Sequence, residues 1–298
     1  MRSDNVNSVK AIISRSDADG IHLENADMDE LVISDLSASA GGVPILDHLN
    51  LTVRKGDCIA LLGPNGQGKS TLLNVLMGSP EYTVTGGSVT LDGEDLLKLT
   101  VDQRARKGLF LAFQAPPEVP GVVASEFYRA GVNSRRSEPI GAYAFRKELE
   151  EACHRTGFNP DLASRNLNDG YSGGEKKRNE ILQMLLLKPD LAFLDEIDSG
   201  LDVDALAQVS DAINSLREQG TTFIIISHYD RLFRMLKPGR TAVIVNGTIA
   251  IEGDGALAER ISAEGYGFLK SEYGIAIEKK RPVSPSCGPQ GAINLGGI

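Results

Sequence analysis

The feature that most constrains the fold of this chain is the segment from Cys58 to Thr71. A short and continuously apolar run, residues 58–62, has the pattern of a buried parallel strand and leads straight into a glycine-rich loop. The loop fits the pattern G-x-x-x-x-G-K-[ST], which binds phosphate when a strand precedes it and a helix follows. It consists of Gly63, Pro64, Asn65, Gly66, Gln67, Gly68, Lys69, Ser70 and Thr71.

The residue types of this loop explain why it could hold a nucleotide. Glycines let the backbone curl until several N–H groups point at one anion, and the start of the following helix adds positive potential. Lys69 is expected to reach the β- and γ-phosphates, and the hydroxyl of Ser70 to ligate Mg²⁺. The alternative is a glycine-rich turn that happens to precede a lysine, and the flanking strand disfavours it. The sequence therefore predicts a site for ATP and Mg²⁺.

The rest of the chain predicts an α/β fold with a mostly parallel sheet. Three later apolar runs resemble the first one, at residues 191–194, 222–226 and 242–245. Helical patterns separate the earlier runs, and alternating strands and helices are typical of a parallel sheet. Upstream of the loop, Leu49, Leu51 and Val53 alternate with polar residues, which is the spacing of a strand.

Composition along the chain predicts three parts. Residues 1–30 are rich in Asp and Glu and lack the apolar stretch of a signal peptide, so we expect a flexible acidic extension. Residues 31–275 have globular patterning, and a mostly helical subdomain is inserted at about residues 115–185. Residues 276–298 contain three prolines and several glycines without periodicity, which predicts a disordered tail.

Charge and cysteine usage exclude several classes of protein. The net charge of −9 argues against a broad nucleic-acid-binding face. A membrane span needs about 20 apolar residues, and the longest aliphatic runs here are only a few residues long, so no direct membrane insertion is expected. The three cysteines are scattered and form no C-x-x-C pair, which argues against a disulfide framework or a self-contained zinc or iron–sulfur site. We expect a cytoplasmic protein.

Two adjacent carboxylates follow the apolar run at residues 191–194. A buried pair of this kind is costly without a cation. Neighbouring residues at a strand end point in different directions and can divide two tasks. We therefore expect Asp195 beside Mg²⁺ and Glu196 on the attacking water; the alternative is an exposed strand end.

A helix is predicted to start at Ser172, a good N-cap residue, and to run to Leu187. Its first turns hold three cations at residues 176–178, where the helix dipole disfavours positive charge. Local rules broken in this way are expected at functional sites. An anion docked on residues 172–174 would ease the conflict, whereas the alternative is a solvated basic helix start.

Gln114 and His228 each follow an apolar run that has the pattern of a strand. Taken alone, either residue is more often a surface or capped polar side chain than a functional one. Their position in the order of the other motifs makes both residues candidates for a function.

That order resembles the ATP-binding cassette (ABC) family, with its Walker A loop, Q-loop, signature, Walker B and H-loop. The resemblance covers roughly residues 31–275, and the stretches 172–184 and 195–206 closely resemble the SufC ATPases of the SUF iron–sulfur cluster assembly system. Residues 113–122 and 265–269 fit these ATPases too. The resemblance implies an α/β P-loop NTPase fold of the ABC type, with a mostly parallel core sheet, an N-terminal antiparallel β part and an inserted helical subdomain.

The resemblance also implies roles for single residues. Gln114 would ligate Mg²⁺ and couple it and the water to a partner, His228 would contact the γ-phosphate, and Asp202 would lie in the loop that joins two sites. Residues 31–57 contain no aromatic side chain, so adenine is expected to rest on aliphatic groups. In an ATP-dependent self-dimer, the ATP of one copy would face four signature residues of the other, namely Ser172, Gly173, Gly174 and Glu175.

The implied function is an ATPase that drives conformational change in SufB/SufD-type scaffold proteins. The alternative is the ATP-binding subunit of a membrane ABC transporter, which uses the same motifs; the stretch Glu175–Asn179 favours the first. A DNA-repair ATPase would usually carry long heptad repeats, and none is sustained here. A catalytically dead subunit is disfavoured because Lys69, Glu196 and His228 are all present.

The segment after Gln114 is a candidate partner surface. Three prolines stiffen residues 115–123, so that little entropy is lost on docking, and its valines offer apolar contact. We expect the partner to grip this segment and the helix around Phe127 and Tyr128. The alternative is that the valines pack inside the helical subdomain.

Overall fold

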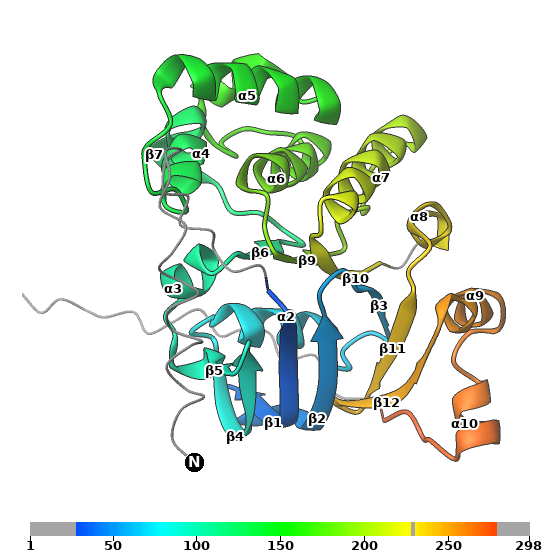
Figure 1. Cartoon of the computed structure of the whole chain (residues 1–298). Coiled ribbons are helices and arrows are strands. Elements are labelled where there is room, and N and C mark those ends of the chain that lie inside the picture. Colours follow the sequence, from blue (N-terminus) through cyan, green and yellow to red (C-terminus); the bar gives the residue numbers. More distant parts are fainter. Residues whose placement is uncertain (1–27, 228–229, 279–298) are drawn as a thin grey trace, which may run out of the picture.

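The computed structural model describes residues 28–227 and 230–278. Most of the expected acidic extension and of the expected tail therefore lies outside the described residues. A six-stranded sheet forms the centre of the described part (Figure 1). Five of its strands are parallel and the edge strand β12 is antiparallel, as predicted for a mostly parallel α/β sheet. Its spatial order is β12 (Thr248–Gly253), β11 (Arg240–Val245), β3 (Cys58–Leu62), β10 (Thr222–Ile226), β9 (Leu191–Asp195) and β6 (Leu109–Ala112).

The central strands are apolar throughout because both faces of the sheet are covered. In β3, Ile59 and Leu61 pack on one side, and Cys58, Ala60 and Leu62 pack on the other. β9 and β10 divide their side chains between the same two cores. Since side chains alternate along a strand, a two-sided core requires a continuous apolar run rather than an alternating one.

A second, antiparallel sheet lies on one side of the first. Its order is β2-β1-β4-β5, which confirms the expected N-terminal antiparallel part. Between the two sheets runs α2, Lys69–Met77, whose buried Leu72, Leu73 and Leu76 join strands of both sheets in one core. Each such leucine contributes about 1.5–3 kcal/mol by its burial. The sheet strands are β1 (Glu30–Ala40), β2 (Val43–Arg54), β4 (Tyr82–Leu91) and β5 (Glu94–Asp95), and β5 leads into η1 (Leu96–Lys98) and α3 (Val101–Arg106).

Helices gather beyond the other face, at the top of Figure 1. The segment expected to be mostly helical contains α4 (Ala124–Asn133), α5 (Ala142–Thr156), η2 (Pro160–Ser164) and α6 (Gly173–Leu187). It also holds a small antiparallel pair that the sequence did not indicate, β7 (Val119–Val123) with β8 (Asn166–Leu167). The remaining helices are α7 (Val203–Glu218), α8 (Asp230–Leu236), α9 (Gly255–Glu264) and α10 (Phe268–Tyr273). Among the helices of residues 28–227 and 230–278, none is long and apolar enough to cross a membrane.

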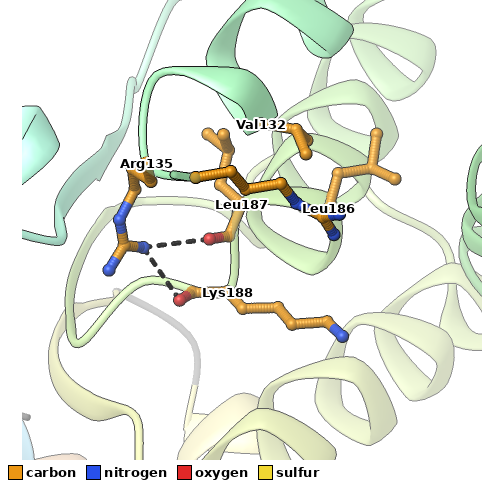
Figure 2. A pocket seen from close by; sticks show the side chains of 6 residues that line it. Val132, Arg135, Leu186, Leu187 and Lys188 are labelled. Atoms are coloured by element: carbon orange, nitrogen blue, oxygen red, sulfur yellow. Dashed lines mark hydrogen bonds between the residues drawn. The ribbon is translucent and has the colours of Figure 1, made fainter. Parts of the chain in front are cut away.

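A pocket of about 170 Å³ opens where α6 ends against α4 (Figure 2). Lys188 leaves the helix in the left-handed region at φ 44°, and Arg135 caps the helix end by donating to the carbonyls of Leu187 and Lys188 at 3.0 and 2.9 Å. The same guanidinium pairs with Asp190 at 2.6 Å. The pocket lining contains none of the motif residues, so this hollow is a by-product of the helix end.

Candidate active site

The phosphate loop takes a conformation that its glycines make possible. Strand β3 ends at Gly63, where φ is 148° and an added Cβ would lie 2.2 Å from the carbonyl oxygen of Ile244. Gly68, at φ 108°, caps α2, and a Cβ there would lie 2.9 Å from Leu46. Within the described part of the chain, no acceptor takes a hydrogen bond from the backbone N–H groups of residues 66–68. These donors at a helix start suit an anion.

Lys69, the first residue of α2, is almost fully buried and folds back over the loop. Its Nζ donates to the carbonyl oxygens of Gly63 at 2.7 Å and Pro64 at 3.0 Å. Burial lowers the pKa of this ammonium, while the carboxylates of Glu196 and Asp195 oppose the shift. The Lys69 ammonium is thus a positive charge beside the curled loop and in the field of two carboxylates. When a nucleotide binds, this ammonium can donate to phosphate oxygens in place of the two carbonyls.

Ser70 and Asp195 meet across the top of the sheet. The Ser70 hydroxyl donates to Oδ1 of Asp195 at 3.1 Å, and burial raises the pKa of the Asp195 carboxyl. Over the described residues, no cluster of three or more His, Cys, Asp or Glu side chains could hold a metal by itself. Two hard oxygens beside a phosphate loop fit Mg²⁺, which is bound through one or two protein oxygens, substrate phosphates and water.

Glu196 follows the end of β9 in a strained backbone conformation. Its φ is 49°, a region that non-glycine residues rarely adopt, and its N–H donates to the carbonyl of Ile226 at 3.0 Å. The side chain accepts a hydrogen bond of 2.7 Å from Nε2 of Gln114. Gln114 lies beyond the end of β6, the parallel neighbour of β9. The two residues meet because parallel strands end at the same edge of a sheet.

Ser172 caps α6, as predicted, and Glu175 completes a capping box. Ser172 Oγ accepts from the Glu175 N–H at 3.3 Å, and the Glu175 carboxylate accepts from the Ser172 N–H at 2.7 Å. The bond from Ser172 lowers the pKa of the Glu175 carboxyl. A Cβ added at Gly173 or Gly174 would meet nothing within 4 Å. This helix start is therefore an open surface of small residues.

Two of the three cations at this helix start, Lys176 and Lys177, bond to groups of the segment that follows β6. Lys177 is buried, and its Nζ donates to the carbonyls of Phe113 at 3.1 Å and Gln114 at 2.7 Å. Lys176 pairs with Glu118 at 2.8 Å. Carbonyl groups and a carboxylate of the preceding segment therefore offset two of the three charges, so these two cations do not themselves require a docked anion.

Glu180 holds the same segment from a second point. It is 5% exposed, and its carboxylate accepts from the Phe113 N–H at 3.0 Å. Burial raises its pKa to about 7. Sequence reasoning missed both Lys177 and Glu180, although two charged residues three apart on one helix, 177 and 180, share a face and could have signalled a common target. Helix α6 thus grips the backbone that carries Gln114.

Replacing Glu180 with glutamine should make stability respond differently to pH. The folded protein keeps this proton up to about pH 7, whereas the unfolded chain releases it near its usual pKa of 4.5. Wild-type stability should thus fall, relative to Glu180→Gln, as pH rises from 5 to 8, by about 2.5 kcal/mol. Urea unfolding at both pH values measures this difference. Glu151→Gln, at an exposed position on α5, is the control. If the difference in unfolding free energy between wild type and Glu180→Gln were the same at both pH values, the raised pKa of Glu180 would be contradicted.

Comparison with known proteins settles the family. A family model described as ABC transporter matches residues 46–199, more than half of the chain. The chain belongs to the ABC ATPase family. The probable ATP-dependent transporter SufC of Escherichia coli (strain K12) is 44% identical over 246 residues, covering 81% of this chain and 99% of the relative. A probable ABC transporter ATP-binding protein of Streptococcus pyogenes serotype M3 is 46% identical over 255 residues, covering 85% and 100%.

Solved structures confirm the fold of this ABC ATPase. A dimeric ATP-binding cassette in a post-hydrolysis state, bound to ADP and phosphate, superposes with a TM-score of 0.66 at 21% identity. The match covers 75% of this chain and 98% of that cassette. The α/β architecture with its added antiparallel sheet is thus that of an ATP-binding cassette.

The remaining expected site residues are distributed as follows. Asp202 caps α7 by accepting from the Ala205 N–H at 2.8 Å. His228 lies outside the described residues, just beyond the strand β10. In the described part of the ABC ATPase, no hydrogen bond or ion pair joins residues 172–175 to the phosphate loop. The structure thus joins the phosphate loop to the end of β9 through Ser70, and joins the end of β9 to the segment after β6 through Gln114.

Two aliphatic residues of β2, a strand without Phe, Tyr or Trp, are candidates for the adenine contact that the sequence predicts. Val43 at the start of β2 is 48% exposed. Ile45 lies beside the loop, since a Cβ at Gly68 would be 3.6 Å from its Cγ2. These two side chains are the candidates for contact with the base.

Three large apolar side chains are exposed in the segment that follows β6. Phe113 is 45% exposed, Val122 is 36% exposed and Phe127 is 43% exposed. We call these three residues the apolar surface. Lys177 and Glu180 of α6 fix its first member through the backbone.

The expected partner surface was wrong for Tyr128, and Val119 is only partly available to a partner. Tyr128 is 3% exposed, and its hydroxyl donates to Asn179 at 2.5 Å, so it is a core residue. Val119 pairs with Leu167 in the β7–β8 ladder and packs partly against the core. Tyr128 instead packs edge-on against the ring of Phe127, one of the residues of the apolar surface.

Proposed function

We propose that this ABC ATPase hydrolyses MgATP to drive conformational change in a SufB/SufD-type scaffold during iron–sulfur cluster assembly. The observation that carries the proposal is the attachment of the signature helix to the apolar surface. Lys177, Asn179 and Glu180 all bond to residues between 113 and 128. The three helix residues belong to the stretch 172–184, which closely resembles SufC. The 44% sequence identity to E. coli SufC supports the same assignment.

In the proposed mechanism, the chain positions ATP and stabilises charge. The phosphate loop binds the β- and γ-phosphates through backbone N–H groups, and Lys69 leaves the loop carbonyls for them. Ser70, Asp195 and the amide oxygen of Gln114 would hold Mg²⁺, and the ion would supply positive charge next to the phosphate oxygens. Glu196, kept in place by Gln114, orients and deprotonates the water, and His228 contacts the γ-phosphate.

A second copy completes each site in this proposal. The open helix start formed by Ser172, Gly173, Gly174 and Glu175 faces the ATP of the other subunit, and Asp202 lies where the two sites meet. The dimeric cassette among the structural neighbours supports an ATP-dependent dimer. Gln114 then passes the nucleotide state to the apolar surface, because it contacts Glu196 on one side and continues into that segment on the other. The cytoplasm is the proposed location.

Two aspartates on the apolar surface should abolish scaffold binding. In Val122→Asp with Phe127→Asp, both altered side chains are exposed, so folding and basal ATPase activity should persist while affinity for purified SufB/SufD-type proteins falls about 30-fold or more. Tyr143→Asp on α5, at a residue 86% exposed, is the matched control. A double variant that folds and still binds would show that the scaffold docks elsewhere, and one that unfolds would show that these side chains are core.

The second candidate is the ATP-binding subunit of a membrane transporter, favoured by the names of several relatives. Such a subunit would use the same ATP chemistry. Purification of the native protein with its partners separates the two, because iron–sulfur scaffold proteins should accompany it under our proposal and membrane permeases under the alternative.

A further inference from the structure

The stretch from Tyr266 to Glu278 returns to the phosphate loop, and the ATPase mechanism gives it no task. Tyr266 belongs to a motif that the sequence singled out, at residues 265–269, just before α10. Its hydroxyl oxygen accepts a hydrogen bond of 2.9 Å from the N–H of Gly63, the first residue of the loop. Since this N–H is at the strand end, the tyrosine fixes the point where the loop begins.

Asn246 fixes the end of the described chain. It lies in the turn between β11 and β12, with φ at 55°. Its Nδ2 donates to the carbonyl of Ala276 at 2.8 Å, and its Oδ1 accepts from the N–H of Glu278 at 2.9 Å. One side-chain amide thus pairs with the backbone on both sides of Ile277, as a neighbouring strand would.

Gln67 joins these contacts to the middle of the loop. It is 2% exposed, its Oε1 accepts from the N–H of Asn246 at 2.5 Å, and its Nε2 donates to the carbonyl of Glu278 at 2.9 Å. The side chain of this loop residue is therefore directed to the turn and to the C-terminal segment, and only its backbone remains for phosphate. We call Tyr266, Asn246 and residues 276–278 the C-terminal clasp.

The clasp acts on a loop that is expensive to order. Three glycines give residues 63–68 wide conformational freedom in the absence of restraint, and fixing each residue costs about 1–2 kcal/mol. Contacts that fix the loop before the nucleotide arrives remove part of this cost from binding. We propose that the C-terminal clasp pre-orders the phosphate loop, and that Tyr266 and Asn246 are positioning residues for binding of the phosphate groups of the nucleotide. The proposal rests on the proposed role of the loop.

Loss of the clasp should weaken every ligand that uses the loop by the same factor. Tyr266→Phe removes one oxygen, and Asn246→Gly removes the amide while keeping a residue that tolerates positive φ. Dissociation constants for ATP, ADP and inorganic pyrophosphate should each rise about fivefold in the first variant and about tenfold in the second. The turnover number at saturating ATP should stay within about twofold of wild type, because the clasp contacts none of the groups proposed to act on the water.

Two controls match these changes. Tyr273→Phe changes an exposed tyrosine of α10, and Lys237→Gly places glycine at an exposed position that, like Asn246, has positive φ. Both should bind nucleotide as the wild type does. A lower melting temperature with unchanged dissociation constants in the clasp variants would show a merely structural role and overturn the proposal. A loss confined to ATP and ADP, with pyrophosphate unaffected, would overturn it too, since the defect would then concern the base.

The outcome is distinguishable from failure of the proposed loop function. If the wild type binds none of the three ligands, or if Lys69→Ala binds them unchanged, the loop is not the phosphate site. If the wild type binds them and Tyr266→Phe does so equally well, the loop assignment stands and the clasp proposal fails. If Asn246→Gly does not fold, Tyr266→Phe alone is sufficient to test whether the clasp affects binding of the phosphate ligands.

Discussion

Glu196→Gln should slow ATP hydrolysis by about 10²-fold or more while ATP affinity stays close to that of the wild type. A positioned general base contributes on this scale, and phosphoryl transfer depends mainly on position and charge. Glutamine has nearly the same shape as glutamate, so its amide oxygen can still accept the hydrogen bond from Gln114. It cannot take a proton from water. Single-turnover hydrolysis and equilibrium binding of ATP separate the two effects.

Lys69→Ala is the comparison variant, and it should weaken both binding and turnover. The Lys69 ammonium bonds to the loop carbonyls and lies in the field of two carboxylates, so its loss removes the cation that the phosphates need. Normal turnover in Glu196→Gln would remove Glu196 from the role of base. Loss of ATP affinity in that variant would instead assign it to nucleotide binding.

Much of the fold was predictable because the strongest signals are local. The run at residues 58–62 lacks polar residues because strand β3 is buried on both faces, and the glycines that follow are needed where the chain meets Ile244 and Leu46. The Ser172 cap is equally local, since it involves a partner three residues away. In each case the sequence pattern and its structural cause lie within one short stretch.

The parts that could not be predicted depend on contacts between distant segments. Glu180 bonds to Phe113 across 67 positions, and Gln67 bonds to Glu278 across 211. The sequence around Gln67 does not show that its side-chain amide bonds to the C-terminal segment instead of to phosphate. Tyr128 was expected to contact the partner, whereas its ring joins the hydrophobic core and its hydroxyl bonds to Asn179 on α6.

The signature helix illustrates how a local observation can have a cause that lies in a distant segment. Cations in the first turns do conflict with the helix dipole. The chain resolves the conflict by using Lys177 as a donor to the Phe113 and Gln114 carbonyls, so the charge serves to attach the Q-loop to α6. An interaction that opposes the helix locally is stabilising once the tertiary partner is present.

Ser172→Arg should abolish ATP-dependent dimers. Ser172 is exposed at the start of α6, beside two glycines whose surroundings are open, which is the surface proposed to meet the ATP of the second copy. A long cationic side chain should not fit against that phosphate face. Sedimentation or light scattering with ATP, in the Glu196→Gln background that preserves the nucleotide, should show dimers for the background variant and monomers after Ser172→Arg is added.

The matched control is Ser172→Ala, because arginine also removes the helix cap. Loss of the cap alone costs about 1 kcal/mol of stability and leaves the surface open. The alanine variant should therefore have a lower melting temperature and still dimerise with ATP. In the wild type, the requirement for two copies predicts ATPase activity that rises faster than linearly with protein concentration. If Ser172→Arg formed dimers of undiminished stability, the signature would lie away from the dimer interface. If wild-type ATPase activity were strictly proportional to protein concentration, one copy would make a complete site.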